Sequence, residues 1–128
     1  MSDDAMRALA KRFFDCVEEG DINGLVACYA PNAEIWHNTD EEIQGPEDNR
    51  KTLAGMVTRI LDRVYDNRRV EVYVGGFVQQ HILRGTRSLD GVRVALPACI
   101  VCAVKDGKIT RLDEYFDSAR VAEFRKFA

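Results

Sequence analysis

The sequence predicts an α+β protein in which helices precede a curved, mostly antiparallel sheet. Helical periodicity fills most of the first half of the chain, whereas alternating strand patterns fill almost all of the second half. The dipeptides Gly75-Gly76, Asp90-Gly91 and Asp106-Gly107 separate the later strands as hairpin turns do. At 128 residues the chain is expected to form a single domain over residues 1–128, with a core large enough to hold a pocket.

Composition and charge exclude several function classes. A net charge of −3 and the lack of a basic stripe argue against nucleic-acid binding. The sequence has no long apolar run and no signal-peptide pattern, so we expect a cytoplasmic protein with no membrane association. Cys99 and Cys102 form a C-x-x-C pair within a strand-like run, which sends their side chains to opposite faces. No second pair completes a zinc site, and we expect neither a metal nor a cofactor.

The chain opens with two predicted helices. Residues 3–19 place apolar side chains on one face at the 3.6-residue period, with Ser2 as N-cap and Gly20 ending the helix. Asp21 can cap a second, short helix over residues 22–29, which Pro31 stops.

A short strand and the longest helix follow. Residues 33–38 alternate as a strand, with Trp36 and Asn38 on one face and Ile35 and His37 on the other. Pro46 suits the first position of a helix, whose apolar stripe predicts that it runs to about Tyr65. The rest of the chain predicts strands over residues 69–74, 77–87, 92–105 and 107–117, then a short helix over residues 118–127.

Turn chemistry gives a first register for these strands. A two-residue Gly75-Gly76 loop places Val74 opposite Phe77, so Gln79 and His81 share the face that packs against the helices. A three-residue loop ending at Gly107 turns one face of the last strand inward, with Ala98 opposite Glu114. That inward face carries Leu112, Glu114 and Phe116. A two-residue loop would instead bury two charges, Arg111 and Asp113, which polarity disfavours. A single carboxylate such as Glu114 between two large apolar side chains either pairs with a buried cation or takes part in catalysis.

The chain resembles the nuclear transport factor 2-like superfamily in the sequence of two segments, residues 19–36 and 106–117. Within that superfamily it is most similar to the SnoaL-like polyketide cyclases and the limonene-epoxide-hydrolase-like proteins. The resemblance implies a cone-shaped α+β roll: a curved sheet wrapped around N-terminal helices, with an internal pocket. It also implies a homodimer formed through the outer face of the sheet.

The resemblance implies candidate site residues. Epoxide hydrolases of this group hold a water with a Tyr and an Asn on the first strand, where this chain has Trp36 and Asn38. Their Arg-x-Asp on a middle strand corresponds to Gln79 and His81, and their second Asp to Glu114. Loss of the Arg and the first Asp argues against epoxide hydrolysis. The cyclases use a His and an acid, with which His81 and Glu114 are compatible.

The leading functional hypothesis is a cofactor-independent enzyme that cyclises or isomerises a small hydrophobic carbonyl or polyketide-like compound. Glu114, His81 and Asn38 are its expected catalytic residues. The expected substrate-binding residues are Trp36, Gln79, Phe77, Leu112, Phe116, Ala98, Met56 and Ile60. One alternative is a hydrolase that holds a water between Asn38 and Glu114. Another is a non-catalytic ligand- or protein-binding module, in which Glu114 and His81 form salt bridges or side chains fill the cone.

Overall fold

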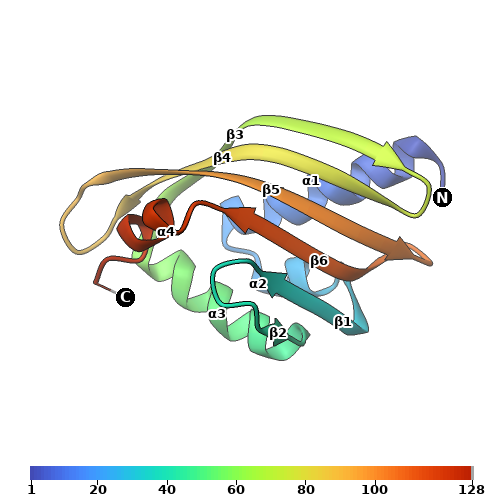
Figure 1. The fold of residues 1–128 in the computed structure, drawn as a ribbon, viewed down its shortest axis with the longest axis horizontal. Coiled ribbons are helices and arrows are strands. Elements are labelled where there is room, and N and C mark those ends of the chain that lie inside the picture. The colour runs from blue at the N-terminus through green and yellow to red at the C-terminus, as the bar shows by residue number, and fades with distance from the viewer. Residues whose placement is uncertain (128) are drawn as a thin grey trace.

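The computed structural model describes residues 1–127, and it has the predicted α+β architecture (Figure 1). Six strands form one sheet in the order β2-β1-β6-β5-β4-β3, antiparallel throughout except for the parallel pair β1 and β6. The sheet curves across the helices, and α4 lies beside β5. The elements are α1 (Asp3–Glu19), α2 (Ile22–Val26), β1 (Tyr29–His37), β2 (Ile43–Gln44), α3 (Pro46–Arg59), β3 (Ile60–Tyr73), β4 (Gly76–Arg87), β5 (Arg93–Lys105), β6 (Lys108–Phe116) and α4 (Ser118–Phe124).

Local capping chemistry fixes the starts of α1, α2 and α4 and the end of α1 as predicted. The Ser2 hydroxyl accepts a hydrogen bond from the backbone of Ala5, which caps α1. Gly20 ends that helix in the left-handed conformation, at φ +76°, which favours glycine. Asp117 caps α4, but that helix ends at Phe124 rather than at residue 127.

The boundary between α3 and β3 differs from the prediction. The helix ends at Arg59, and the chain from Ile60 onward pairs with β4. Two bulges, marked by the positive φ of Asp62 and Asn67, let this long strand follow the curve of the sheet. The apolar residues that seemed to extend a helical stripe therefore belong to a bent strand.

Arg63 holds this boundary in place. Its guanidinium donates to the backbone carbonyls of Val17 and Glu18 at the end of α1, at 2.9 and 3.1 Å. It also donates to the carbonyls of Val57 and Ile60 at the end of α3. One side chain thus binds backbone carbonyls at the C-terminal ends of two helices, where the helices themselves offer few donors.

The start of β1 also differs from the prediction. The second helix ends at Val26, and the strand begins at Tyr29 instead of residue 33. Tyr29 already pairs with Ile109 of β6, and a register shift follows before the pairing resumes at Glu34. This irregularity accommodates Pro31 within the strand, since proline cannot donate to a ladder.

The β3–β4 register is displaced by two residues from the predicted one. Val72 lies opposite Phe77 and Val70 opposite Gln79, because the loop consists of Val74 and Gly75. Gly76 is already in the strand, where a Cβ would lie only 2.0 Å from the Cys102 carbonyl. An even displacement keeps each side chain on its predicted face.

The β5–β6 turn has two residues instead of three, Asp106 and Gly107, both at positive φ. A bulge between the Ala103 and Val104 pairs restores the predicted faces, so Glu114 points inward but lies opposite Ile100 instead of Ala98. The bulge supplies the extra residue that the shorter turn omits, and the charged neighbours of Glu114 stay outside.

Within residues 1–127, no helix is both long and apolar enough to cross a bilayer. In the same part of the chain, no three His, Cys, Asp or Glu side chains converge as a metal site would require. The four cysteines are free thiols. Cys102 is fully buried and Cys99 only partly so, as expected for side chains on opposite faces of β5.

Candidate functional site

A row of inward side chains crosses the sheet at Glu114. Backbone pairing aligns Gln79 of β4 with Ile100 of β5, Ile100 with Glu114 of β6, and Glu114 with His37 of β1. Adjacent strands lie about 4.8 Å apart. His37 is therefore the direct neighbour of Glu114, whereas β4, which carries Gln79 and His81, lies two strands away.

Glu114 and His37 form a close pair. Nε2 of His37 lies 3.1 Å from Oε1 of Glu114, and the two side chains are 13% and 19% exposed. The imidazole stacks on the ring of Phe116, with centroids 5.9 Å apart and an interplanar angle of 23°. A carboxylate and an imidazole in this arrangement can exchange a proton with each other and with a third group beside them.

The pair borders an internal cavity. An inner chamber of about 80 Å³ lies beside Glu114 and His37, with Tyr65 on its wall. A deep chamber of about 40 Å³ extends from it towards α1 and shares His37, Tyr65 and Glu114 with it. Apolar side chains dominate the inner chamber, namely Leu53, Met56, Leu83, Leu96, Phe116, Val121 and Phe124.

The structure brings only some of the predicted binding residues to this cavity. Met56 and Phe116 line the inner chamber, and Leu112 lines the deep one. The other predicted wall residues, Phe77, Ile60 and Ala98, line neither chamber. Phe77 is fully buried core, Ile60 is buried where α3 meets β3, and Ala98 lies opposite His81 in the sheet.

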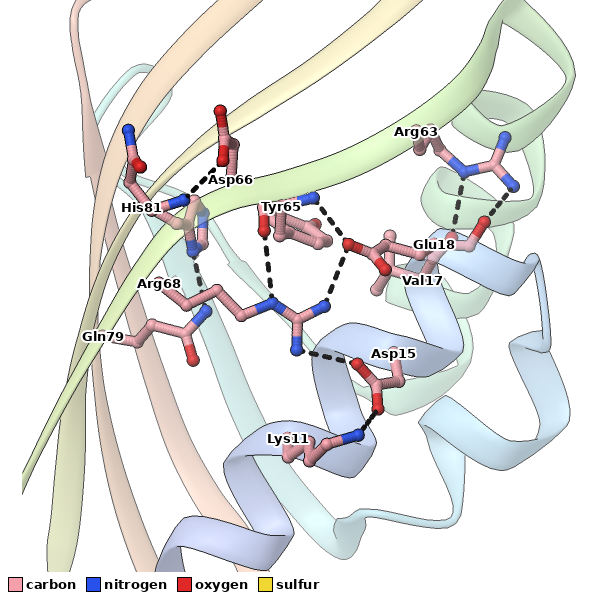
Figure 2. Close-up of polar contacts among 11 residues, drawn as sticks. Lys11, Asp15, Val17, Glu18, Arg63, Tyr65, Asp66, Arg68, Gln79 and His81 are labelled. Carbon is pink, nitrogen blue, oxygen red and sulfur yellow. Dashed lines mark hydrogen bonds and ion pairs between the residues drawn. The ribbon is translucent and has the colours of Figure 1, made fainter.

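Gln79 and His81 form a separate buried pair. The Gln79 amide nitrogen lies 2.9 Å from Nδ1 of His81, beside the ring of Tyr65 (Figure 2). The imidazole packs edge-on against the rings of Phe14 and Tyr65. Burial lowers the pKa of His81 to about 4, against the opposing effect of the Glu114 charge. Neither Gln79 nor His81 lines a chamber, so the structure does not place them beside the Glu114 carboxylate.

Tyr65 lies between the buried Gln79–His81 pair and the cavity. Its ring centroid lies 4.5 Å from that of His81, and it also lines both chambers. Its backbone N–H donates to Glu18, and Arg68 binds Asp15 and Glu18 of α1, which anchors this part of β3 (Figure 2). Burial raises the pKa of Tyr65, so its hydroxyl stays protonated and can donate a hydrogen bond.

The faces of β1 are the reverse of those implied by the family resemblance. Trp36 lies on the outer face, where its ring packs edge-on against Tyr115 at 5.3 Å. Asn38 follows β1 and binds the backbone of Phe116 with both amide atoms, at 3.0 and 3.1 Å. The amide that was expected to hold a water instead joins the ends of β1 and β6.

Sequence reasoning missed His37, although a signal was present. Ala33 and Ile35 are buried, and strand alternation puts His37 on their face. Asn49 was also not predicted as a site residue, although it is 3% exposed and lines both chambers. Its side chain accepts a hydrogen bond from the Tyr29 hydroxyl at 2.7 Å, a contact between distant segments that no local pattern indicates.

Comparison with known proteins agrees with this architecture. An uncharacterised protein of Mycobacterium tuberculosis is 26% identical, over 96% of this chain and 97% of the relative. A proposed SnoaL-like polyketide cyclase of Shewanella putrefaciens superposes with a TM-score of 0.81 at 14% identity, over 96% of this chain and 86% of that one. An epoxide hydrolase of M. tuberculosis, of the limonene-epoxide-hydrolase-like type, gives 0.77 at 19% identity, over 94% and 87%.

These structural neighbours share the fold. The family itself is identified by sequence, because residues 10–112 match the model of the SnoaL-like domain. The chain therefore belongs to the SnoaL-like family, and its fold is the nuclear transport factor 2-like cone.

Proposed function

We propose that this protein is a cofactor-independent acid–base enzyme that isomerises or cyclises a small hydrophobic carbonyl compound. The observation that carries the proposal is the contact between Glu114 and His37 at the wall of a mostly apolar cavity. Proton abstraction next to a carbonyl requires a base, a second group that can take the proton from that base, and an apolar chamber for the substrate. His37 takes the role that the sequence had assigned to His81.

The chemistry follows from the groups on the cavity wall. The Glu114 carboxylate takes a proton from the carbon next to the carbonyl, and the electron pair moves to the carbonyl oxygen. The protonated hydroxyl of Tyr65 donates to that oxygen and stabilises the enolate. Return of the proton from Glu114 or His37 to a different carbon isomerises the compound. Attack of the enolate carbon on a second carbonyl closes a ring instead.

The size of the cavity restricts the substrate. The inner chamber, about 80 Å³, is smaller than the roughly 150 Å³ cavity that holds a benzene molecule. A polycyclic polyketide is too large to be enclosed, so the group that reaches Glu114 contains only a few heavy atoms. We therefore narrow the substrate class to small ketones or to compounds that insert a short carbonyl-bearing end.

Hydrogen–deuterium exchange tests the proposal without knowledge of the natural substrate. Pentan-2-one and butan-2-one are incubated with the protein in D₂O, and loss of the proton signals next to the carbonyl is followed by NMR. We expect exchange above the buffer rate, and a fall of at least about a hundredfold in Glu114→Gln, since general bases contribute this much or more. Asp113→Asn is the matched control, because Asp113 pairs with Arg111 outside the cavity. Equal exchange by Glu114→Gln would refute the assignment.

A second candidate is a non-catalytic ligand-binding module. The pairing of Glu114 with His37 and the small volume of the chambers favour it, because a binding protein needs neither a free base nor room for a transition state. It predicts that the same ketones bind without any exchange above buffer. The hydrolytic alternative has less support, since the Asn38 amide is bonded to the backbone of Phe116.

A further inference from the structure

The inner chamber opens onto a wider basin at the protein surface. This basin, of about 330 Å³, lies between α3, the end of β1 and the residues that follow α4. It shares four residues with the inner chamber: His37, Thr52, Arg59 and Arg125. The two spaces therefore meet at these side chains, and a molecule that reaches Glu114 from the basin passes both arginines.

The basin is positively charged on a protein whose net charge is −3. Three cations line it, Lys51, Arg59 and Arg125, against the single carboxylate of Asp40. Among residues 1–127, none of these three cationic side chains forms a salt bridge or a hydrogen bond. By contrast, five arginines of the sheet are bound to carboxylates or backbone carbonyls, namely Arg63, Arg68, Arg84, Arg87 and Arg111.

Gly55 leaves room for the Arg59 guanidinium. This glycine lies within α3 one turn before Arg59 and lines the basin with it. A Cβ at residue 55 would lie 2.9 Å from Nη1 of Arg59, so the guanidinium lies over the helix surface at Gly55 and would have to shift if residue 55 carried a side chain. Glycine weakens the interior of a helix, and here it lets a cation lie over the basin.

We propose that the ligand of this site carries an anionic group, which Arg59 and Arg125 bind at the basin while the uncharged carbonyl end enters the inner chamber. The inference deepens the function proposed above and rests on the same cavity. Guanidinium groups bind carboxylates and phosphates through paired hydrogen bonds. The Glu114 carboxylate repels a second negative charge in the inner chamber. The anionic end of the ligand therefore stays at the basin, and its carbonyl end faces Glu114.

Binding of keto acids tests the inference directly. Levulinate, 5-oxohexanoate and 6-oxoheptanoate place a carboxylate at increasing distance from a ketone, and their methyl esters are matched neutral probes. NMR titration of the protein measures Kd for each pair. We expect at least one acid to bind about tenfold or more tightly than its ester, a preference that weakens with added salt. Equal affinity of every acid and its ester, or no binding of any acid, would overturn the proposal.

Variants locate the anion site. Arg59→Gln and Arg125→Gln are each expected to reduce the preference for the acid several-fold, and Gly55→Ala should also reduce it by displacing the Arg59 guanidinium without removing a charge. Arg120→Gln is the matched control, because Arg120 lies on α4, outside the basin, and donates to the Ala95 carbonyl. An undiminished preference in both basin variants would overturn the assignment.

The failure of this inference differs from failure of the proposed function. Titrations with the Glu114→Gln protein report on anion binding without turnover, and we expect the preference for the acid to persist there. A ketone phosphate of the same length, 4-oxopentyl phosphate, separates the two anion classes: tighter binding than 5-oxohexanoate identifies a phosphate site, and weaker binding identifies a carboxylate site. Exchange of neutral ketones with no preference for anions would leave the catalytic proposal standing and contradict this one.

Discussion

Replacement of His81 by glutamine is expected to weaken the dependence of the free energy of unfolding on pH under acidic conditions. His81 is 4% exposed and packs against the rings of Phe14 and Tyr65, where a charged imidazole loses its hydration. Its pKa falls from the ordinary 6.5 to about 4 in the folded protein. Between these two values the unfolded chain binds a proton at His81 that the folded protein does not. The free energy of unfolding therefore falls as the pH falls from 6.5 to 4.

The size of the effect follows from the two pKa values. They differ by about 2.5 pH units, and each unit corresponds to about 1.4 kcal/mol. The contribution of His81 to the free energy of unfolding should thus fall by roughly 3 kcal/mol when the pH is lowered from 7 to 4. Glutamine fits the same buried space without titrating, so His81→Gln lacks this contribution at every pH.

Urea unfolding at intervals between pH 7 and pH 4 measures this contribution. The quantity to compare is the stability difference between the wild-type protein and His81→Gln, since other titrating groups cancel from it. We expect the difference to shift in favour of the variant by roughly 3 kcal/mol towards pH 4. Phe14→Leu is the control, because it loosens the same packing without removing a titrating group. A stability difference for His81→Gln that stays constant across this range would refute the placement of a neutral, buried His81.

Three further substitutions test contacts that hold the fold together. Arg63→Met removes the donor shared by the ends of α1 and α3 and should lower the free energy of unfolding by about 3 kcal/mol in urea unfolding. Gly76→Ala drives a Cβ into the Cys102 carbonyl and should cost roughly 3 kcal/mol, measured as a lowered thermal midpoint. Asn38→Ala frees the backbone of Phe116 and should cost about 1–2 kcal/mol, with faster amide exchange at residue 116.

Local chemistry made much of the fold predictable. The Ser2, Gly20 and Asp117 caps involve residues within a few positions of one another, and their signals are written in the sequence. The faces of the later strands were also predictable, although both hairpin registers were displaced by two residues. Because side chains alternate with a period of two, an even displacement leaves Glu114 and His81 pointing inward.

Contacts between distant segments were not predictable in the same way. An apolar run with helical spacing continued past Arg59, and only pairing with β4 identifies the residues from Ile60 onward as a strand. The partner of Glu114 depends on the parallel pairing of β6 with β1, which no turn specifies. The resemblance to epoxide hydrolases indicated Trp36 and Asn38, whereas burial of Ala33 and Ile35 turns His37 inward instead.

The most direct test of the central claim compares the two histidines. The claim is that Glu114 acts with His37, its neighbour in the sheet, and not with His81 two strands away. The measurement is the rate at which the protein catalyses deuterium exchange at the carbon atoms next to the carbonyl of pentan-2-one. We predict that His37→Asn lowers this rate at least about tenfold, whereas His81→Gln, assayed at pH 7 where it stays folded, changes it little. Loss of exchange in His81→Gln with full exchange in His37→Asn would contradict the account.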